Sequence, residues 1–203
     1  MRLGIFGGSF DPIHYGHLIL AECCREQHAL DRVWFVPTAV SPHKIGAEPV
    51  SAAARCEMLK LAIGGHVPFD ICKIEIERGG VSYTVDTLTA IKDEHPEAEL
   101  FFLMGADSLA DFGSWREPAR ICELAKVVVV SRPGSGDPDF DSLNGVVDAK
   151  VAEEIRSLHV QMPQIEISSS EIRARVAEGR TIRFQTARAV EKYIETNQLY
   201  LPA

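Results

Sequence analysis

The sequence has no long hydrophobic run. None of its 203 residues falls within a segment approaching the roughly 20 consecutive apolar residues that a membrane-spanning helix requires. The first fifteen residues also lack the charged start, apolar core and small-residue cleavage site of a signal peptide, because Gly7, Gly8 and Asp11 interrupt the apolar residues. We therefore expect a cytoplasmic protein that does not associate with a membrane.

An excess of basic residues is also absent. The formal net charge is -8 at pH 7, whereas proteins that bind nucleic acids usually carry a broad basic face. The five cysteines are odd in number and show no CxxC spacing, which predicts reduced thiols and argues against a structural zinc site. Any anion that the protein binds should therefore be small and held locally.

Apolar residues are sufficient for a single core, since 46% of the chain is hydrophobic and its length is that of one domain. Patterns typical of strands and helices alternate along it. We expect strands near 2–6, 33–37, 70–77, 99–104 and 126–131, and helices over 14–29 and 51–63, after Thr84, briefly after Asp107, over 117–125, from Ser168 and over 186–196. This alternation predicts an α/β fold with a mostly parallel sheet covered on both faces. The Gly- and Pro-rich segment 132–142 predicts a loop, a soft boundary before a C-terminal helical portion of a single domain, 1–203.

The segment LGIFGGSFDPIHYGH, residues 3–17, lies where the first strand hands over to a helix. In parallel sheets, ligands bind outside the carboxyl ends of the strands. Gly7 and Gly8 allow the backbone to approach a ligand closely, and the start of the next helix offers unpaired N–H groups and a positive dipole end. The segment therefore suits an anion, although it matches neither GxxxxGK[ST] nor GxGxxG.

His14 and His17 share one face of the helix if the helix begins by His14. Gly16 between them costs about 1 kcal/mol relative to alanine, which we interpret as a sign that a ligand packs closely there. Two alternatives stay open: surface or core histidines without a function, and a metal pair that lacks the HExxH glutamate and a third ligand. The two histidines lie at a helix start that follows a pair of glycines, and this position favours contacts with phosphate oxygens.

The segment GGSFDPIHYGH resembles the signature of the HxGH nucleotidyltransferase superfamily. Further motifs follow in order, namely SPHK at 41–44, SYTVDTL at 82–88, GADSL at 105–109 with Trp115 after it, RPG at 132–134 and ISSSEIR at 167–173. Together they resemble the bacterial nicotinate-nucleotide adenylyltransferases from residue 3 to the closing YIETNQLY. The resemblance implies a Rossmann-like, doubly wound domain. It also implies transfer of AMP from ATP to nicotinate mononucleotide with Mg²⁺, giving nicotinate adenine dinucleotide and pyrophosphate.

The resemblance implies roles for residues at the ATP site. His14 would contact the phosphates, His17 would support the transition state and Arg173 would act as the cationic clamp, and these three are the catalytic candidates. The implied ATP-binding residues are Gly7, Gly8, Ser9, Phe10, His14, His17, Ser168, Ser170 and Arg173. No protein ligand to the metal is expected, because Mg²⁺ usually reaches such sites through substrate phosphates and water.

The resemblance also implies residues near the phosphate of the acceptor. His43 and Lys44 belong to the PH[RK] element of the family, and Arg132 lies where the family has an arginine beside the acceptor. Ser41 departs from the proline that is frequent in the family. Taken singly, Lys44 and Arg132 would be ordinary solvated charges.

Three further residues match the part of the family that recognises the nucleoside of the acceptor. Asp107 would bind the ribose and Trp115 would stack on the pyridine, while the backbone at Thr84 would receive the nicotinate carboxylate. Taken alone, Trp115 would be a partly buried core ring and Asp107 a helix cap.

Two other functions remain open at this point. One is another HxGH transferase that uses nicotinamide mononucleotide, glycerol phosphate or pantetheine phosphate as acceptor, and the other is a nucleotide-binding regulator without turnover. The SYTVDTL and GADSL segments should distinguish the first, and the intact His14, His17 and Arg173 argue against the second. The expected partners are ATP and nicotinate mononucleotide, with no nucleic acid, no membrane and the oligomeric state open.

Overall fold

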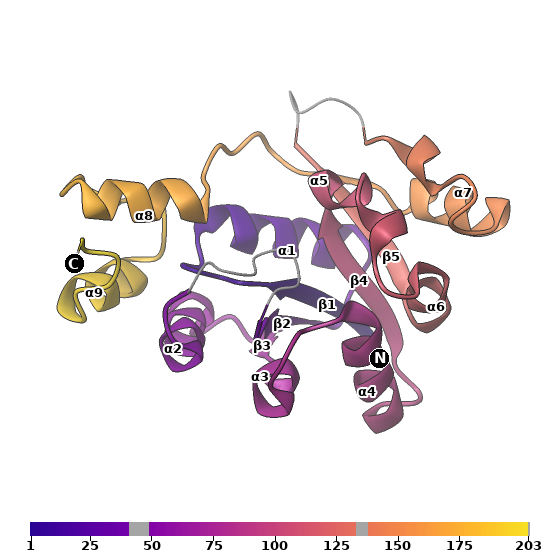
Figure 1. Cartoon of the computed structure of the whole chain (residues 1–203), viewed down its shortest axis with the longest axis horizontal. Helices are drawn as coiled ribbons and strands as arrows, with labels where there is room; N and C mark the ends of the chain where they lie inside the picture. The colour runs from indigo at the N-terminus through magenta and orange to yellow at the C-terminus, as the bar shows by residue number, and fades with distance from the viewer. Residues whose placement is uncertain (41–48, 133–137, 203) are drawn as a thin grey trace.

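A computed structural model describes residues 1–40, 49–132 and 138–202 (Figure 1). Its centre is a parallel sheet with the strand order β3-β2-β1-β4-β5-β6. The strands are β1 (Arg2–Gly8), β2 (Arg32–Pro37), β3 (Phe69–Ile71), β4 (Glu99–Gly105), β5 (Lys126–Ser131) and β6 (Val160–Gln161). The chain starts at the centre and winds outward in both directions, so the order reverses between β1 and β4. Ligands of doubly wound folds bind at such a reversal.

Helices cover both faces of the sheet (Figure 1). One face packs against α1 (Tyr15–Gln27), α2 (Ala52–Ile63), α8 (Ser169–Ala177) and α9 (Arg188–Thr196). The other packs against α3 (Ile74–Arg78), α4 (Thr84–Glu94), α5 (Ala106–Leu109), η1 (Phe112–Ser114), α6 (Pro118–Leu124), η2 (Phe140–Leu143) and α7 (Ala149–Ser157). The expected α/β, Rossmann-like architecture is confirmed.

The strand side chains alternate between the two layers. In β4, Phe101 and Leu103 enter the layer with α1, whereas Leu100, Phe102 and Met104 enter the layer with α4. This period of two is the geometry of a strand, and burial of both faces explains why central strands appear as continuous apolar runs. The predicted strands near 2–6, 33–37, 99–104 and 126–131 are confirmed.

The predicted strand over 70–77 is wrong beyond its first residues. β3 ends at Ile71, and residues 74–78 form the short helix α3. The pattern IEIE suggested a strand with the isoleucines inside, but Glu75 is buried at 5% exposure, while Ile76 is only half-buried. The Glu75 carboxylate accepts a hydrogen bond from the Thr87 hydroxyl of α4 at 2.7 Å. A tertiary contact has therefore overridden a short alternating pattern.

Smaller differences concern other elements. The short helix expected after Asp107 begins at Ala106, one residue before Asp107, and Gly105 is its N-cap. Helix α7 and strand β6 were not predicted, and both follow the proposed boundary at 132–142, part of which lies outside the described residues. In the described parts of the chain, no helix is long and apolar enough to cross a membrane.

Candidate active site

The loop between β1 and α1 is held in place by hydrogen bonds that its backbone carbonyl groups accept. Four of its carbonyl oxygens accept hydrogen bonds from residues distant in sequence: Ser9 from Arg55 Nη1 at 2.9 Å, Asp11 from Arg173 Nη1 at 2.7 Å, Pro12 from Ser169 Oγ at 2.9 Å and Ile13 from Thr186 Oγ1 at 2.7 Å. The donors come from α2, α8 and the segment before α9. We call this arrangement the carbonyl clamp. The clamp pairs the loop's carbonyl oxygens, which carry partial negative charge, with hydrogen-bond donors of the surrounding fold. The loop can therefore accept an anion without competition from those oxygens.

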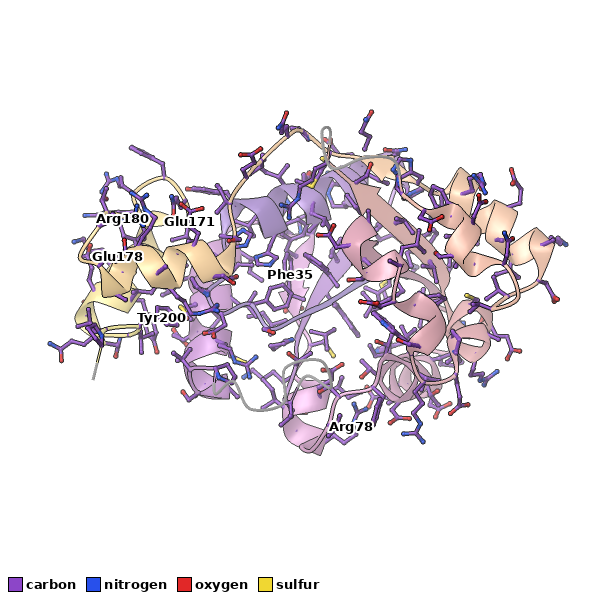
Figure 2. All side chains as sticks on the ribbon, turned by 45° about the horizontal axis from the view of Figure 1, so that its top comes forward. Phe35, Arg78, Glu171, Glu178, Arg180 and Tyr200 are labelled. Carbon is purple, nitrogen blue, oxygen red and sulfur yellow. The ribbon has the colours of Figure 1, made fainter. Side chains whose placement is uncertain are left out.

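The side chain of Asp11 is the buried centre of the clamp, with 7% of the residue exposed. Its Oδ1 accepts a hydrogen bond from the Tyr200 hydroxyl at 2.6 Å, and its Oδ2 lies 4.0 Å from Arg173 Nη1. Burial and the contact with Asp11 raise the pKa of Tyr200, which therefore stays protonated and donates. Figure 2 shows Tyr200 at the end of the molecule that α8 and α9 form. The far end of the chain thus fixes the loop that follows the first strand.

His14 and His17 form a stacked pair at the start of α1, with ring centroids 3.7 Å apart. The His14 backbone N–H donates to His17 Nδ1 at 3.3 Å, so a neutral His17 carries its proton on Nε2. His14 is 3% exposed, and burial, with a smaller contribution from the charge of Arg132, lowers its pKa from 6.5 to about 4. In the described structure the buried Nδ1 of His14 has no hydrogen-bond partner. His14 is therefore neutral near pH 7, and the pair can donate hydrogen bonds to an anion.

The geometry changes two interpretations of this segment. A Cβ atom on Gly16 would lie 3.0 Å from the His14 ring, so the glycine makes room for that ring and need not indicate a close ligand. The Phe10 ring is 1% exposed and packs against Phe6 and Phe35 with centroids 5.5 Å away in each case. Phe10 can therefore reach ATP only through its backbone.

Four further predicted residues lie around the loop, three from the ATP set and Arg132 from the acceptor set. Arg173 is half-buried at the clamp, and Arg132 lies at the end of β5, near enough to His14 to lower the pKa of its ring. Ser168 is the N-cap of α8 and accepts from Glu171 N at 3.1 Å, as expected, while Ser170 is exposed on the first turn. The middle serine of the triplet, Ser169, makes the contact with the loop that the sequence did not reveal.

A cavity of about 450 Å³ opens on the α4 side of the β1 and β4 strands. It brings together residues predicted for both substrates: Gly7 and Gly8 at the end of β1 and the following Ser9 from the ATP set, and Thr84, Asp107 and Trp115 from the acceptor set. His14, His17, Ser168, Ser170, Arg173 and Arg132 do not line it. The cavity and the clamped loop therefore meet at the end of β1, where Ser9 belongs to both, and extend from it in different directions.

The first turn of α4 forms one wall of this cavity. Thr84 is its first residue, and the preceding Tyr83 supplies no side-chain cap, so the first amide groups of the helix keep their capacity to bind a ligand. Trp115 is half-buried opposite this wall and packs against Phe102 and Phe112, with ring centroids 6.0 and 5.6 Å away. Arg116 lies at the mouth, 5.0 Å from the Tyr83 ring. The arrangement suits a flat ring that carries an anionic substituent.

Sequence reasoning missed several residues that build the site. The clamp residues Asp11, Arg55, Ser169, Thr186 and Tyr200 lie far apart in the chain, and no local pattern connects them. Within the cavity, Glu75 and Ser82 are buried polar residues that were not predicted. The SYTVDTL motif contained a signal, since it carries four hydroxyl-bearing residues before and within a helix start.

The predicted residues His43 and Lys44 lie outside the described residues. Among the residues that are described, no group of three or more His, Cys, Asp or Glu side chains could hold a metal ion. The donors around the loop are amides, imidazoles and guanidinium groups, which suit phosphate oxygens better than a divalent cation. All five cysteines are free thiols.

Comparison with known proteins agrees with this geometry. The model of the cytidylyltransferase-like family matches residues 5–175. A protein of Thermomicrobium roseum named "Probable nicotinate-nucleotide adenylyltransferase" is 49% identical over 98% of this chain and 91% of its own length. A protein of the same name from Thermus thermophilus is 45% identical over 98% of this chain and 100% of its own length. The structure of Plasmodium falciparum nicotinic acid mononucleotide adenylyltransferase complexed with NaAD superposes with a TM-score of 0.76 at 20% identity, covering 98% of this chain and 97% of that one.

The chain has a doubly wound sheet with stacked histidines at the helix that follows its switch point, and it belongs to the cytidylyltransferase-like family of nucleotidyltransferases. Within that family, its full-length relatives identify it as a member of the nicotinate-nucleotide adenylyltransferases, which act in NAD biosynthesis.

Proposed function

We infer that this protein transfers the adenylyl group of ATP to nicotinate mononucleotide, giving nicotinate adenine dinucleotide and pyrophosphate. The observation that carries this inference is the end of β1 at residues 7–9, where the acceptor cavity meets the clamped loop at Ser9. A transferase that joins two nucleotides needs two sites that meet where the new bond forms. The triphosphate lies along the clamped loop and α8, and the acceptor lies in the cavity.

The chemistry needs no general base from the protein. The nucleophile is a phosphate monoester whose second pKa is about 6, so it is largely ionised at neutral pH. The protein must instead hold two polyanions together and stabilise the negative charge that develops at the α-phosphorus and the leaving pyrophosphate. The neutral His14 donates a hydrogen bond without the electrostatic cost of burying a cation, His17 adds a second donor, and Arg173 and Arg132 supply fixed positive charge.

Magnesium fits this arrangement as an ion carried by the phosphates of ATP, since the described residues offer no carboxylate cage. When bound, Mg²⁺ would neutralise part of the negative charge of the triphosphate. Lys44 and His43 of the SPHK segment are proposed to add positive charge near the acceptor phosphate.

The acceptor is proposed to be held by three contacts in the cavity. Its pyridine ring stacks on Trp115, its ribose contacts Asp107, and its carboxylate lies against the amides at the start of α4 near Thr84. Nicotinamide mononucleotide is the second candidate acceptor, because the ring of Trp115 can stack on either pyridine.

One experiment tests the proposed function directly. The protein is incubated with MgATP and a panel of phosphorylated acceptors, and the dinucleotide product is identified by mass while pyrophosphate release is measured. We expect nicotinate adenine dinucleotide as the main product. Product only from pantetheine phosphate or glycerol phosphate would contradict the proposal, and ATP binding without any product would indicate a regulator.

A further inference from the structure

Glu75 lines the acceptor cavity beside Thr87, the fourth residue of α4. Glu75 is 5% exposed, and its Oε1 accepts a hydrogen bond from Thr87 Oγ1 at 2.7 Å. In the described structure its Oε2 is buried and has no hydrogen-bond partner. A buried carboxyl oxygen without a donor is costly when the group is ionised. The ionised form of Glu75 is therefore sensitive to a further negative charge in the cavity that the residue lines.

Glu75 lies close to the position where the charge of an acidic acceptor is expected. Thr87 and Thr84 are three residues apart on α4 and both line the cavity, and residues at this spacing are neighbours on one helix face, with Cβ atoms about 5–6 Å apart. An ionised Glu75 would thus compete with the nicotinate carboxylate for the same positive helix end and would repel it. A protonated Glu75 would do neither.

We propose that Glu75 is a specificity-determining residue of the acceptor site. Glu75 must be protonated for tight binding of the acid acceptor, whereas its protonation state does not affect binding of the amide. The proposal rests on the proposed function, since it concerns the acceptor of that reaction. The preference for nicotinate over nicotinamide mononucleotide then depends on pH through a group of the protein. No corresponding requirement exists for the amide, because it brings no charge to the α4 helix start.

The surroundings of Glu75 leave few other sources of such a pH dependence. Burial raises the pKa of Glu75, whereas the hydroxyls of Thr87 and Ser82 and the charge of Arg78 act in the opposite direction. Figure 2 shows Arg78 on α3, and its guanidinium donates to Thr87 Oγ1 at 3.1 Å. Burial also raises the pKa of the neighbouring Cys72 thiol, which keeps it neutral. The other charged or titratable residues lining the cavity, Tyr83, Asp107, Asp111 and Arg116, are not among the causes of the shift in the pKa of Glu75.

The test compares two acceptors that differ only in the group of interest. The ratio of kcat/KM for nicotinate and nicotinamide mononucleotide is measured as a function of pH, so the titration of the phosphate that both acceptors share cancels. We expect the ratio to fall about tenfold between about pH 5 and about pH 9. The repulsion between two like charges near one helix end weakens binding by about this factor. Glu75→Gln, which keeps an Oε1 acceptor for Thr87, should hold the ratio at its low-pH value throughout.

Calorimetry gives a second measurement that does not depend on turnover. Binding of each mononucleotide is measured in buffers of different ionisation enthalpy, which reports the number of protons taken up. The unmodified protein should take up more protons with the acid than with the amide, and Glu75→Gln should take up equal numbers. Asp93→Asn, which removes an exposed carboxylate of α4 outside the cavity, should behave as the unmodified protein does.

Equal proton uptake with both acceptors in the unmodified protein, or a ratio that keeps its pH dependence in Glu75→Gln, would overturn the role of Glu75. Failure of the proposed function would look different, since neither mononucleotide would then be adenylylated at any pH.

Discussion

The two halves of the active site are built in different ways. The carbonyl oxygens of the loop at residues 9–14 accept hydrogen bonds from side chains in three distant parts of the chain. The ring of His14 in this loop packs against the ring of His17 in α1. The acceptor half is a cavity of about 450 Å³ whose predicted ligands include an exposed aspartate, Asp107, and a half-buried ring, Trp115. The first half is preorganised for a ligand and the second leaves space for one.

This difference matches the tasks of the two halves. The triphosphate side must stabilise charge that develops during the reaction, and donors fixed beforehand do so without reorganising. The acceptor side must choose among similar mononucleotides, and choice depends on a few polar groups in a shaped cavity. Changes in the clamped half should therefore alter turnover and ATP binding, while changes in the cavity should alter acceptor preference.

The largest effect is expected from His17→Ala. Loss of a donor that strengthens in the transition state should lower kcat by about 10²–10³ and change ATP affinity much less. Steady-state kinetics combined with equilibrium ATP binding checks this split. Near-normal turnover with weakened ATP binding would make His17 a binding residue only.

The next effect concerns acid stability. His14 has a pKa of about 4 in the folded protein against 6.5 when unperturbed, so the unfolded chain binds a proton that the folded one excludes. Stability should therefore fall as pH decreases from about 6.5 to about 4, by up to about 3 kcal/mol from this residue. Urea unfolding at a series of pH values should show a shallower decline in His14→Asn. Parallel curves for the two proteins would remove His14 as the cause.

Removal of the Tyr200 hydroxyl should weaken the clamp alone. Tyr200→Phe leaves a buried carboxylate oxygen of Asp11 without its donor, at a cost of about 1–3 kcal/mol. We expect a lower melting temperature and weaker ATP binding, with acceptor binding unchanged. Tyr193→Phe on α9, whose hydroxyl makes no hydrogen bond in the described structure, is the matched control. Equal losses for both substrates would mean that the two halves are not separate.

A smaller effect should follow from Arg173→Lys. The charge is kept, but the planar fork that binds Asp11 O and is proposed to bind a phosphate group as well is lost, so triphosphate binding should weaken about tenfold. Arg175→Lys, on the same helix but bound to Thr181 O, is the control. Unchanged ATP affinity in Arg173→Lys would place this arginine outside the phosphate site.

The smallest effect is expected at the first turn of α4. Thr84→Pro removes one backbone donor at a position where proline is tolerated in a helix, and Tyr83 before it already has an extended conformation. The preference for nicotinate over nicotinamide mononucleotide should shrink by about tenfold or less, provided that circular dichroism shows an intact fold. Trp115→Phe should leave the preference unchanged. An unaltered ratio in Thr84→Pro would move the carboxylate site elsewhere.

The sequence predicted the parts of the protein that depend on local patterns. Alternating strands and helices, the glycine turn and the i, i+3 histidines all follow from residues close together in the chain, and the structure places them as expected. The strand over 70–77 was wrong because Glu75 is buried against Thr87, a contact that the alternation of IEIE cannot reveal. The clamp was invisible for the same reason, since hydrogen bonds such as Thr186 to Ile13 join residues 173 positions apart.

The carbonyl clamp also has a consequence for how the protein is made. The loop that follows β1 leaves the ribosome early, but its partner Tyr200 is synthesised 189 residues later. Contacts of such long range close late and slowly in folding. A growing chain can therefore form the acceptor side of the sheet before its ATP side is complete. A polypeptide interrupted before α9 would retain the HxGH segment and the donors to its carbonyl groups, and yet lack the Tyr200 hydroxyl that binds the Asp11 carboxylate.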